Sequence, residues 1–147
     1  MTPGTLHFEL VTLDGTKFGE DVYEIILPTP DGEIAILPNH IPLVSLAVPG
    51  VIGVRRRATD SDGQMEYFAT NGGVIEITDN IVRVLVDEAD REDEISEQEA
   101  QKALERAQQL LSSAKDKVEL DKAQSLMDRH TVRLKVAGLR RHKRTRL

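Results

Sequence analysis

The spacing of apolar residues changes once along this chain, and that change constrains the fold more than any other feature. Up to Asp87, apolar and polar residues alternate in short runs, as in half-buried strands. From Ser96 onward, apolar residues recur every three or four positions, as on one face of a helix. We therefore predict an all-β N-terminal sandwich over residues 1–87 and a C-terminal antiparallel α-helical hairpin over residues 96–138, with an acidic linker at 88–95 and a basic tail at 139–147.

Turn residues divide the N-terminal part into short strands. Residues 6–13 alternate and end at Asp14-Gly15, and residues 17–19 form a short second strand or a bend. The triplet Asn71-Gly72-Gly73 predicts a tight hairpin, as does the pair Asp79-Asn80. Prolines 28 and 30 are expected to end the third strand. The remaining strands are predicted at residues 22–27, 33–37, 43–48, 51–57, 64–70, 74–77 and 81–86.

The C-terminal part carries the start and stop signals of two helices. Ser96 with Glu99 fits a capping box, and Asp116 with Glu119 marks a second helix start. Gly138 is the expected stop. The apolar face is rich in alanine, and each buried methyl contributes only about 0.8 kcal/mol. We expect a marginal helix pair that could undock as a switch, although the same pattern fits a fixed capping hairpin.

The stretch DGEIAILPNHIPLV at residues 31–44 contains a stiff corner. A short strand is stopped by Pro38, after which Asn39 tolerates a left-handed turn and Pro42 fixes the backbone again. Rigid exposed corners on a β-scaffold can present side chains to a partner. The alternative is a purely structural corner in which His40 makes a local hydrogen bond, and the pattern alone favours this second interpretation.

Charge is distributed unevenly along the chain. Residues 1–128 carry 11 Lys and Arg against 25 Asp and Glu, whereas residues 129–147 carry 8 basic residues and no acidic one. An acidic body with a basic tail suggests a tail that meets an acidic partner. The acids of residues 87–94 lack the regular ligand spacing of a cation site, so we expect a solvated linker there.

Several function classes lack support in the sequence. There is no Cys, no apolar stretch near the roughly 20 residues of a spanning helix, and no visible secretory signal. Gly72-Gly73 lacks the Lys-Ser/Thr of a phosphate loop, and no nucleophile has a nearby base. We therefore predict neither catalytic residues nor a metal site. The four histidines are scattered along the chain: His7, His40, His130 and His142.

The order of these motifs resembles the epsilon subunit of F-type ATP synthases over essentially the whole chain. The resemblance rests on DGEIAILPNHIPLV, on NGGVIEI at residues 71–77, on VLVDEADREDEI at residues 84–95, and on the alanine-rich helical pair that follows. In the family the matching signals are a G-E-x-x-I/L-x-x-x-H-x-P-L run, a G-G-x-x-E-V/I run and a V-x-x-L-A/V-D-x-A run. No single motif is decisive, but their order and spacing are.

The resemblance implies a non-catalytic rotor subunit in the central stalk of a proton-translocating ATP synthase. Its sandwich would join the gamma subunit to the c-ring, and its helices would inhibit ATP hydrolysis by contacting the alpha and beta subunits. Membrane contact would occur only through the complex, at the cytoplasmic face of a bacterial plasma membrane. The implied contacts to the c-ring and gamma are Glu33, Pro38, Asn39, His40 and Pro42. The implied inhibitory contacts are Arg129, Arg133, Lys135, Arg140 and Arg141, with Lys143 and Arg144 as further candidates.

Some members of the family bind ATP in the folded hairpin through an I/L-D-x-x-R-A motif. Here the matching residues run from Ile95 to Ala100, with Ser96 in place of the Asp and Glu99 in place of the Arg. A carboxylate replaces a phosphate-facing cation, so we expect weak or absent ATP binding and no required cofactor. The alternative function is a free-standing β-sandwich adaptor with a basic tail that binds nucleic acid, although self-repulsion between nucleic acid and the acidic body argues against it.

Overall fold

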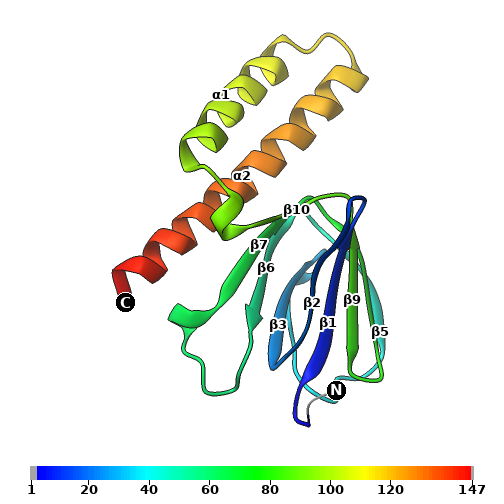
Figure 1. Cartoon of the computed structure of the whole chain (residues 1–147). Coiled ribbons are helices and arrows are strands. Elements are labelled where there is room, and N and C mark those ends of the chain that lie inside the picture. Colours follow the sequence, from blue (N-terminus) through cyan, green and yellow to red (C-terminus); the bar gives the residue numbers. More distant parts are fainter. Residues whose placement is uncertain (1–2, 147) are drawn as a thin grey trace.

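The computed structural model describes residues 3–146, with side chains through Lys143, and confirms a β-sandwich followed by two helices (Figure 1). Ten short strands make up the sandwich, in keeping with their alternating sequence. They are β1 (Leu6–Thr12), β2 (Gly15–Val22), β3 (Glu24–Thr29), β4 (Gly32–Ile36), β5 (Leu43–Ala47), β6 (Gly50–Arg55), β7 (Glu66–Thr70), β8 (Gly73–Thr78), β9 (Ile81–Val86) and β10 (Ala89–Arg91). Two 3-10 turns, η1 (Asp62–Gln64) and η2 (Glu92–Glu94), lie between elements.

The strands form two five-stranded sheets, which we name by their central strands. The β9 sheet has the order β2-β1-β9-β8-β5, and the β6 sheet has the order β10-β7-β6-β3-β4. β1 and β9 run parallel, whereas the other neighbours are antiparallel. Alternate side chains of each strand fill the space between the sheets, as in β1, where Leu6, Phe8 and Leu10 are fully buried.

The turn chemistry is confirmed at most of the predicted positions. β1 and β2 pair through residues 12 and 15, and β3 and β4 pair through residues 29 and 32. Asp79 and Asn80 both have positive φ, 49° and 61°, which a tight turn between β8 and β9 requires. Asx side chains tolerate this backbone region better than most residues.

The hairpin predicted at Asn71-Gly72-Gly73 is wrong. β7 belongs to the β6 sheet and β8 to the β9 sheet, so the triplet carries the chain from one layer to the other. Gly72 supplies a φ of +99° for this corner. Gly73 allows close backbone contact, because a Cβ there would lie 1.9 Å from the carbonyl oxygen of Leu85.

Other predicted boundaries also differ from the structure. β2 is a full eight-residue strand, and β3 continues through Pro28 because β6 pairs only with residues 24–26 of that strand. The segment expected as an acidic linker contains β10, which pairs with β7, so this part is sandwich. Gly138 does not end the second helix, which continues through Arg146. Contacts of residues on both sides of Gly138 offset the roughly 1 kcal/mol that glycine costs inside a helix.

The two helices begin where their capping residues predict. α1 (Glu97–Ser113) follows Ser96, whose Oγ accepts the Glu99 backbone N–H at 3.3 Å. α2 (Lys117–Arg146) follows Asp116, whose Oδ1 accepts the Glu119 backbone N–H at 2.8 Å. The helices pack along each other as an antiparallel hairpin with a small-residue seam, in which Ala100, Ala107 and Ala123 are buried.

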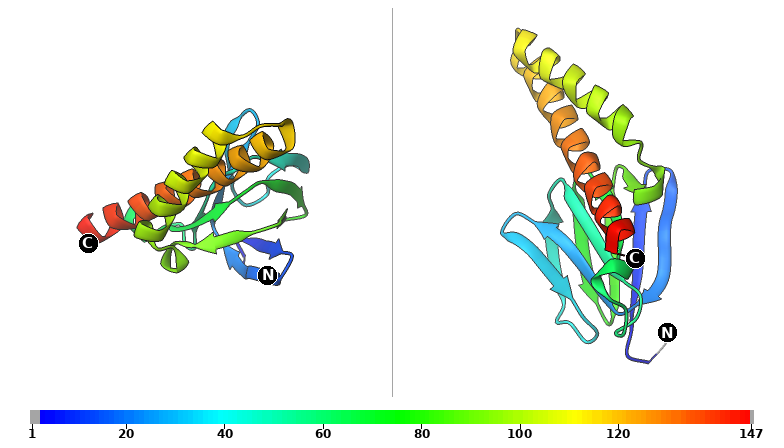
Figure 2. Two further views of the ribbon diagram at one scale, coloured as in Figure 1. Left: turned by 90° about the horizontal axis from the view of Figure 1, so that it is seen from above. Right: turned by 90° about the vertical axis from the view of Figure 1, so that its left-hand side faces the viewer.

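Helix α2 also packs on the sandwich, whereas α1 lies on the side of α2 away from the strands (Figures 1 and 2). Val132, Val136 and Ala137 form a buried cluster with Ala69 of β7 and with Ile95. Val51 and Tyr67 border this cluster, so the β6 sheet is covered on both faces. Helix α2 therefore has two buried sides, one on α1 and one on the sandwich.

Among the described residues, none of the helices combines the length and apolar character that crossing a membrane requires.

We expect Gly73→Ala to lower the free energy of unfolding by about 2–3 kcal/mol or more, because the new methyl would overlap the Leu85 carbonyl. Chemical denaturation measures this change. Gly63→Ala is the matched control, since its added Cβ would meet only Ser61 Oγ at 3.7 Å. If the two variants were equally stable, Gly73 would not lie in close contact with the Leu85 carbonyl.

Candidate interaction surfaces

The corner after β4 is held by hydrogen bonds to a neighbouring turn. Asn39 has a φ of +67°, and the His40 N–H donates to the Leu37 carbonyl at 3.2 Å. The Asn39 backbone N–H donates to Asn80 Oδ1 at 2.5 Å, and Asn80 Nδ2 donates to Asn39 Oδ1 at 3.1 Å. The turns at 37–40 and 79–80 therefore brace each other at one end of the sandwich.

The five predicted contact residues of this region are accessible to different degrees. Glu33, Asn39 and Pro42 are exposed, whereas Pro38 and His40 are partly buried. His40 Nδ1 lies 2.6 Å from the Ile41 carbonyl oxygen, which is the local hydrogen bond of the structural interpretation. Glu33 lies on β4, about 13 Å along the strand from the corner at 3.3 Å per residue, so these residues form an extended strip.

An apolar patch continues from this corner onto the outer face of the β9 sheet. Ile41 and Val44 are each 74% exposed. Leu46 of β5, Val74 of β8 and Leu85 of β9 are also exposed, and they lie side by side in register across three strands. We define Ile41, Val44, Leu46, Val74 and Leu85 as the sheet patch. Sequence reasoning placed Ile41 in the corner and the other four residues in strands, and it missed their exposure, because alternation does not show which face a partner covers.

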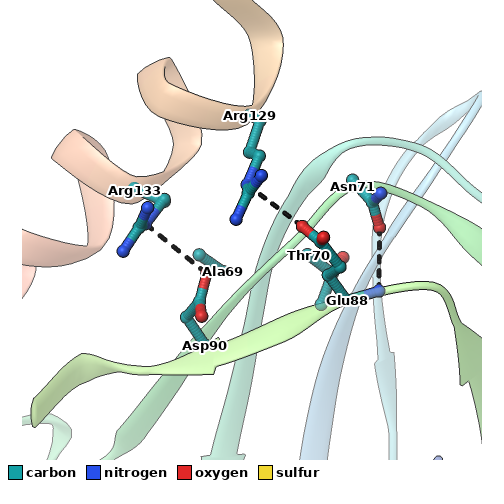
Figure 3. Close-up of a pocket in the computed structure, with 7 residues that line it drawn as sticks. All are labelled: Ala69, Thr70, Asn71, Glu88, Asp90, Arg129 and Arg133. Carbon is teal, nitrogen blue, oxygen red and sulfur yellow. Dashed lines mark hydrogen bonds and ion pairs between the residues drawn. The ribbon is translucent and has the colours of Figure 1, made fainter. Parts of the chain in front are cut away.

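On the opposite side of the sandwich, α2 is held to the acidic segment by ion pairs (Figure 3). Arg129 Nε lies 3.1 Å from Glu88 Oε2, and Arg133 Nε lies 3.4 Å from Asp90 Oδ2. Figure 3 shows both guanidinium groups pointing from α2 toward the strand that carries the acids. The Glu88 N–H in turn donates to Asn71 Oδ1 at 3.3 Å, which fixes the start of this segment.

The pairing continues toward the end of α2. Arg140 Nη1 donates to the Glu92 carbonyl at 2.5 Å, and Lys143 Nζ donates to Glu92 Oε1 at 2.6 Å. Arg141 Nη2 lies 3.2 Å from Glu97 Oε1 of α1. The solvated linker expected at residues 88–95 is therefore wrong, because Glu88, Asp90 and Glu92 pair with the basic end of the chain. Lys135 is exposed, and Arg144 lies outside the residues whose side chains are described.

His130 occupies an unusual position between the helices. Its side chain is only 8% exposed, and it lines a groove of about 510 Å³ with Glu99, Lys102, Arg106 and Arg133. Burial lowers the pKa of His130 below its ordinary value of 6.5, and the nearby Arg129, Arg133 and Arg106 lower it further, while Asp90 opposes them. The imidazole is therefore neutral at pH 7.

The described residues contain no group of three or more His, Asp or Glu side chains arranged to hold a metal ion.

Ser96 and Glu99, which replace the Asp and Arg of the nucleotide motif, lie at the start of α1. Ser96 caps the helix, and Glu99 places a carboxylate at the edge of the groove that contains His130.

The lowered pKa of His130 predicts a pH dependence of the helical hairpin. An unfolded His130 binds more protons than the folded one in the window just below pH 6.5, so stability falls as the pH falls through that window. We expect urea unfolding, followed by circular dichroism, to show a less stable hairpin at about pH 5.5 than at about pH 7.5. His130→Gln should reduce this difference, and an unchanged difference would exclude His130 as its source.

Comparison with known proteins places both parts of the chain in one family. Residues 5–92 match the beta-sandwich domain of the ATP synthase delta/epsilon chain, and residues 93–138 match its long alpha-helix domain. The ATP synthase epsilon chain of Nitratidesulfovibrio vulgaris (strain DP4) is 34% identical over 134 residues, which cover 91% of this chain and 96% of that protein. The epsilon chain of Herpetosiphon aurantiacus is 33% identical over 138 residues, or 94% and 98%.

Solved structures share the fold. A chain in the Euglena gracilis mitochondrial ATP synthase structure (OSCP/F1/c-ring, rotational state 1) superposes with a TM-score of 0.77 at 23% identity, covering 93% of this chain and 83% of that one. A chain in the Tetrahymena thermophila central stalk/c-ring structure gives a TM-score of 0.56 at 16% identity, with 88% and 93% covered. Because both of its domains match and its relatives are similar over nearly their whole length, the chain belongs to the delta/epsilon chain family of ATP synthases.

Proposed function

We propose that this chain is the non-catalytic epsilon subunit of an ATP synthase central stalk. Its sandwich joins the gamma subunit to the c-ring, and its helical hairpin restrains ATP hydrolysis. The observation that carries this proposal is the match of residues 5–138 to both domains of the family, together with a structure in which the helices are attached by a small interface. The solved relatives belong to assemblies that contain a c-ring or a central stalk.

The sandwich supplies two surfaces suited to the stalk. The sheet patch offers exposed apolar area of the kind that marks protein interfaces, and we assign it to the gamma subunit. The braced corner with Pro38, Asn39, His40 and Pro42, and the exposed Glu33 on β4, are assigned to the c-ring and the gamma junction. The mutual hydrogen bonds of Asn39 and Asn80 support this, because a rigid corner loses little entropy on binding.

The hairpin is attached weakly enough to leave the sandwich. Its apolar contact is the small cluster around Val132, Val136 and Ala137. Partly exposed ion pairs such as Arg129–Glu88 contribute at most about 1 kcal/mol each. Once released, the cations at the candidate inhibitory positions can pair with acids of the alpha and beta subunits instead. Those positions are Arg129, Arg133, Lys135, Arg140 and Arg141.

We further propose that the chain needs no cofactor and binds ATP weakly or not at all. Glu99 places a carboxylate in the groove between the helices, where it opposes the attraction of phosphate to the cations of Lys102, Arg106 and Arg133. Association with the membrane then occurs through the complex alone, at the cytoplasmic face of a bacterial plasma membrane.

Titration calorimetry at low salt tests the nucleotide proposal. We expect no ATP binding with sub-millimolar affinity, and Glu99→Arg should strengthen any residual binding by removing a carboxylate and adding a cation. Sub-millimolar affinity of the unaltered chain would contradict the proposal.

Deletion of residues 98–147 tests the inhibitory role. We expect the complex to assemble with the truncated chain, because the sandwich keeps its own core, and we expect ATP hydrolysis by the soluble complex to rise. Co-purified subunits and steady-state ATPase activity are the two readouts. Normal assembly with unchanged hydrolysis would mean that the hairpin does not inhibit.

Affinity purification separates the stalk subunit from the alternative adaptor. A tagged chain should recover the alpha, beta and gamma subunits and the c-ring. Substitution of Leu46 and Val74 in the sheet patch by Glu should abolish recovery of gamma, because charges would be buried without partners. Recovery of nucleic acid without gamma would favour the adaptor.

A further inference from the structure

Helix α2 extends beyond the part of the chain that matches the family. The matched long alpha-helix domain ends at residue 138, whereas α2 continues to Arg146. Because the helix does not break at Gly138, the residues after it are carried on the same rod that packs against the sandwich. Their positions are therefore fixed relative to β7 by Val136 and Ala137, which lie in the buried cluster.

The extension makes two contacts with one residue of the body. Arg140 Nη1 donates to the backbone carbonyl of Glu92 at 2.5 Å, and Lys143 Nζ donates to the Glu92 carboxylate at 2.6 Å. The Lys143 and Glu92 side chains are each only 17% exposed. The ammonium group also lies 5.7 Å from the centre of the Tyr67 ring of β7. These contacts are better shielded from water than the Arg129–Glu88 pair, so they are stronger.

Glu92 is held to the sandwich by contacts of the residues around it. It follows β10 directly in η2, which packs against β7. On its two sides, Arg91 donates to the Lys17 carbonyl of β2 at 2.7 Å, and Glu94 accepts from Lys17 Nζ at 2.7 Å. A bond from α2 to Glu92 is therefore a bond between the hairpin and the body.

We propose that the C-terminal extension of α2 is a lock that holds the hairpin on the sandwich. The lock consists of Arg140 and Lys143 on the helix and Glu92 and Tyr67 on the body. The same two cations cannot bind Glu92 and an acidic partner at the same time, so release of the lock precedes any contact of the helix end with another subunit. This regulatory consequence rests on the proposed function, whereas the lock itself does not.

Because the sequence contains no cysteine, a single introduced cysteine can report when α2 leaves the sandwich. Val136 is completely buried between α2 and the sandwich, so a Val136→Cys thiol can react with a thiol reagent only when α2 lifts off. The labelling rate then reports the undocked fraction even when that fraction is small. A second single-cysteine background, Ala107→Cys, reports separation of the two helices, because Ala107 is buried in their seam.

In the Val136→Cys background, Lys143→Glu and Glu92→Lys should each raise the labelling rate on the order of tenfold or more. The double charge swap, Lys143→Glu with Glu92→Lys, should return the rate toward that of the parent. Arg141→Glu is the matched control, because it makes the same charge change at the same helix end but pairs with Glu97 of the hairpin itself. Neither Lys143→Glu nor Glu92→Lys should accelerate labelling of Ala107→Cys, because neither residue pairs across the helix seam.

Unchanged labelling in Lys143→Glu and in Glu92→Lys would overturn the lock. A double swap that does not restore protection would also overturn it, provided that the single and double variants remain folded by circular dichroism. Truncation after Gly138 provides a variant without new charges and should also raise the rate. ATPase activity of the assembled complex separates the two proposals. In Glu92→Lys, which keeps every candidate inhibitory cation, faster labelling with unchanged hydrolysis would uphold the lock and contradict the inhibitory role.

Discussion

The contact of α2 with the sandwich is the interaction on which the rest of the molecule depends. One face of this helix packs on α1, and another covers the β6 sheet, so α1 has no extensive contact with the strands of its own. If α2 leaves, both helices leave. The contact combines few apolar side chains with a row of ion pairs to residues 88–92. Such an interface is specific in register but modest in free energy.

The two parts of the chain are therefore built for different mechanical tasks. The sandwich core is formed by fully buried side chains of both sheets, and its corner and turns are braced by hydrogen bonds. The hairpin has an alanine seam and is attached by a small apolar cluster and a row of ion pairs. A shaft subunit needs a body that transmits force without deforming, and a regulatory arm needs two positions of similar free energy. Under the proposed function, the sandwich serves as the body and the hairpin as the arm.

Much of this arrangement could be predicted from the sequence, and the errors have identifiable causes. The alternation in β1 and the capping residues Ser96 and Asp116 are local signals. They correctly predicted a strand and the starts of two helices. Asn71-Gly73 was misassigned because turn residues show that the chain turns but not which sheet the next strand joins. Gly138 was taken as a stop because its neighbours' contacts with the sandwich are not visible in a helical pattern.

The candidate surfaces were likewise predicted only in part. The corner at residues 38–42 was identified from its prolines and from Asn39, whose positive φ is confirmed. The sheet patch was missed, because an exposed valine in a strand has the same sequence signature as a buried one. The tail was expected to meet an acidic partner, and four of its cations meet acidic residues of the chain itself: Arg129 and Arg133 pair with Glu88 and Asp90, Lys143 with Glu92, and Arg141 with Glu97.

If ion pairs help to hold a detachable hairpin on a rigid body, raising the salt concentration should increase the population in which the two parts are separated. Spin labels on cysteines at the exposed positions Asp31 and Ser112 report the separation of the sandwich from the hairpin. We expect one narrow distance at low salt and a growing second population toward about 1 M salt, where charges are screened within roughly 3 Å. A single narrow distance throughout that range, in a folded chain, would contradict it.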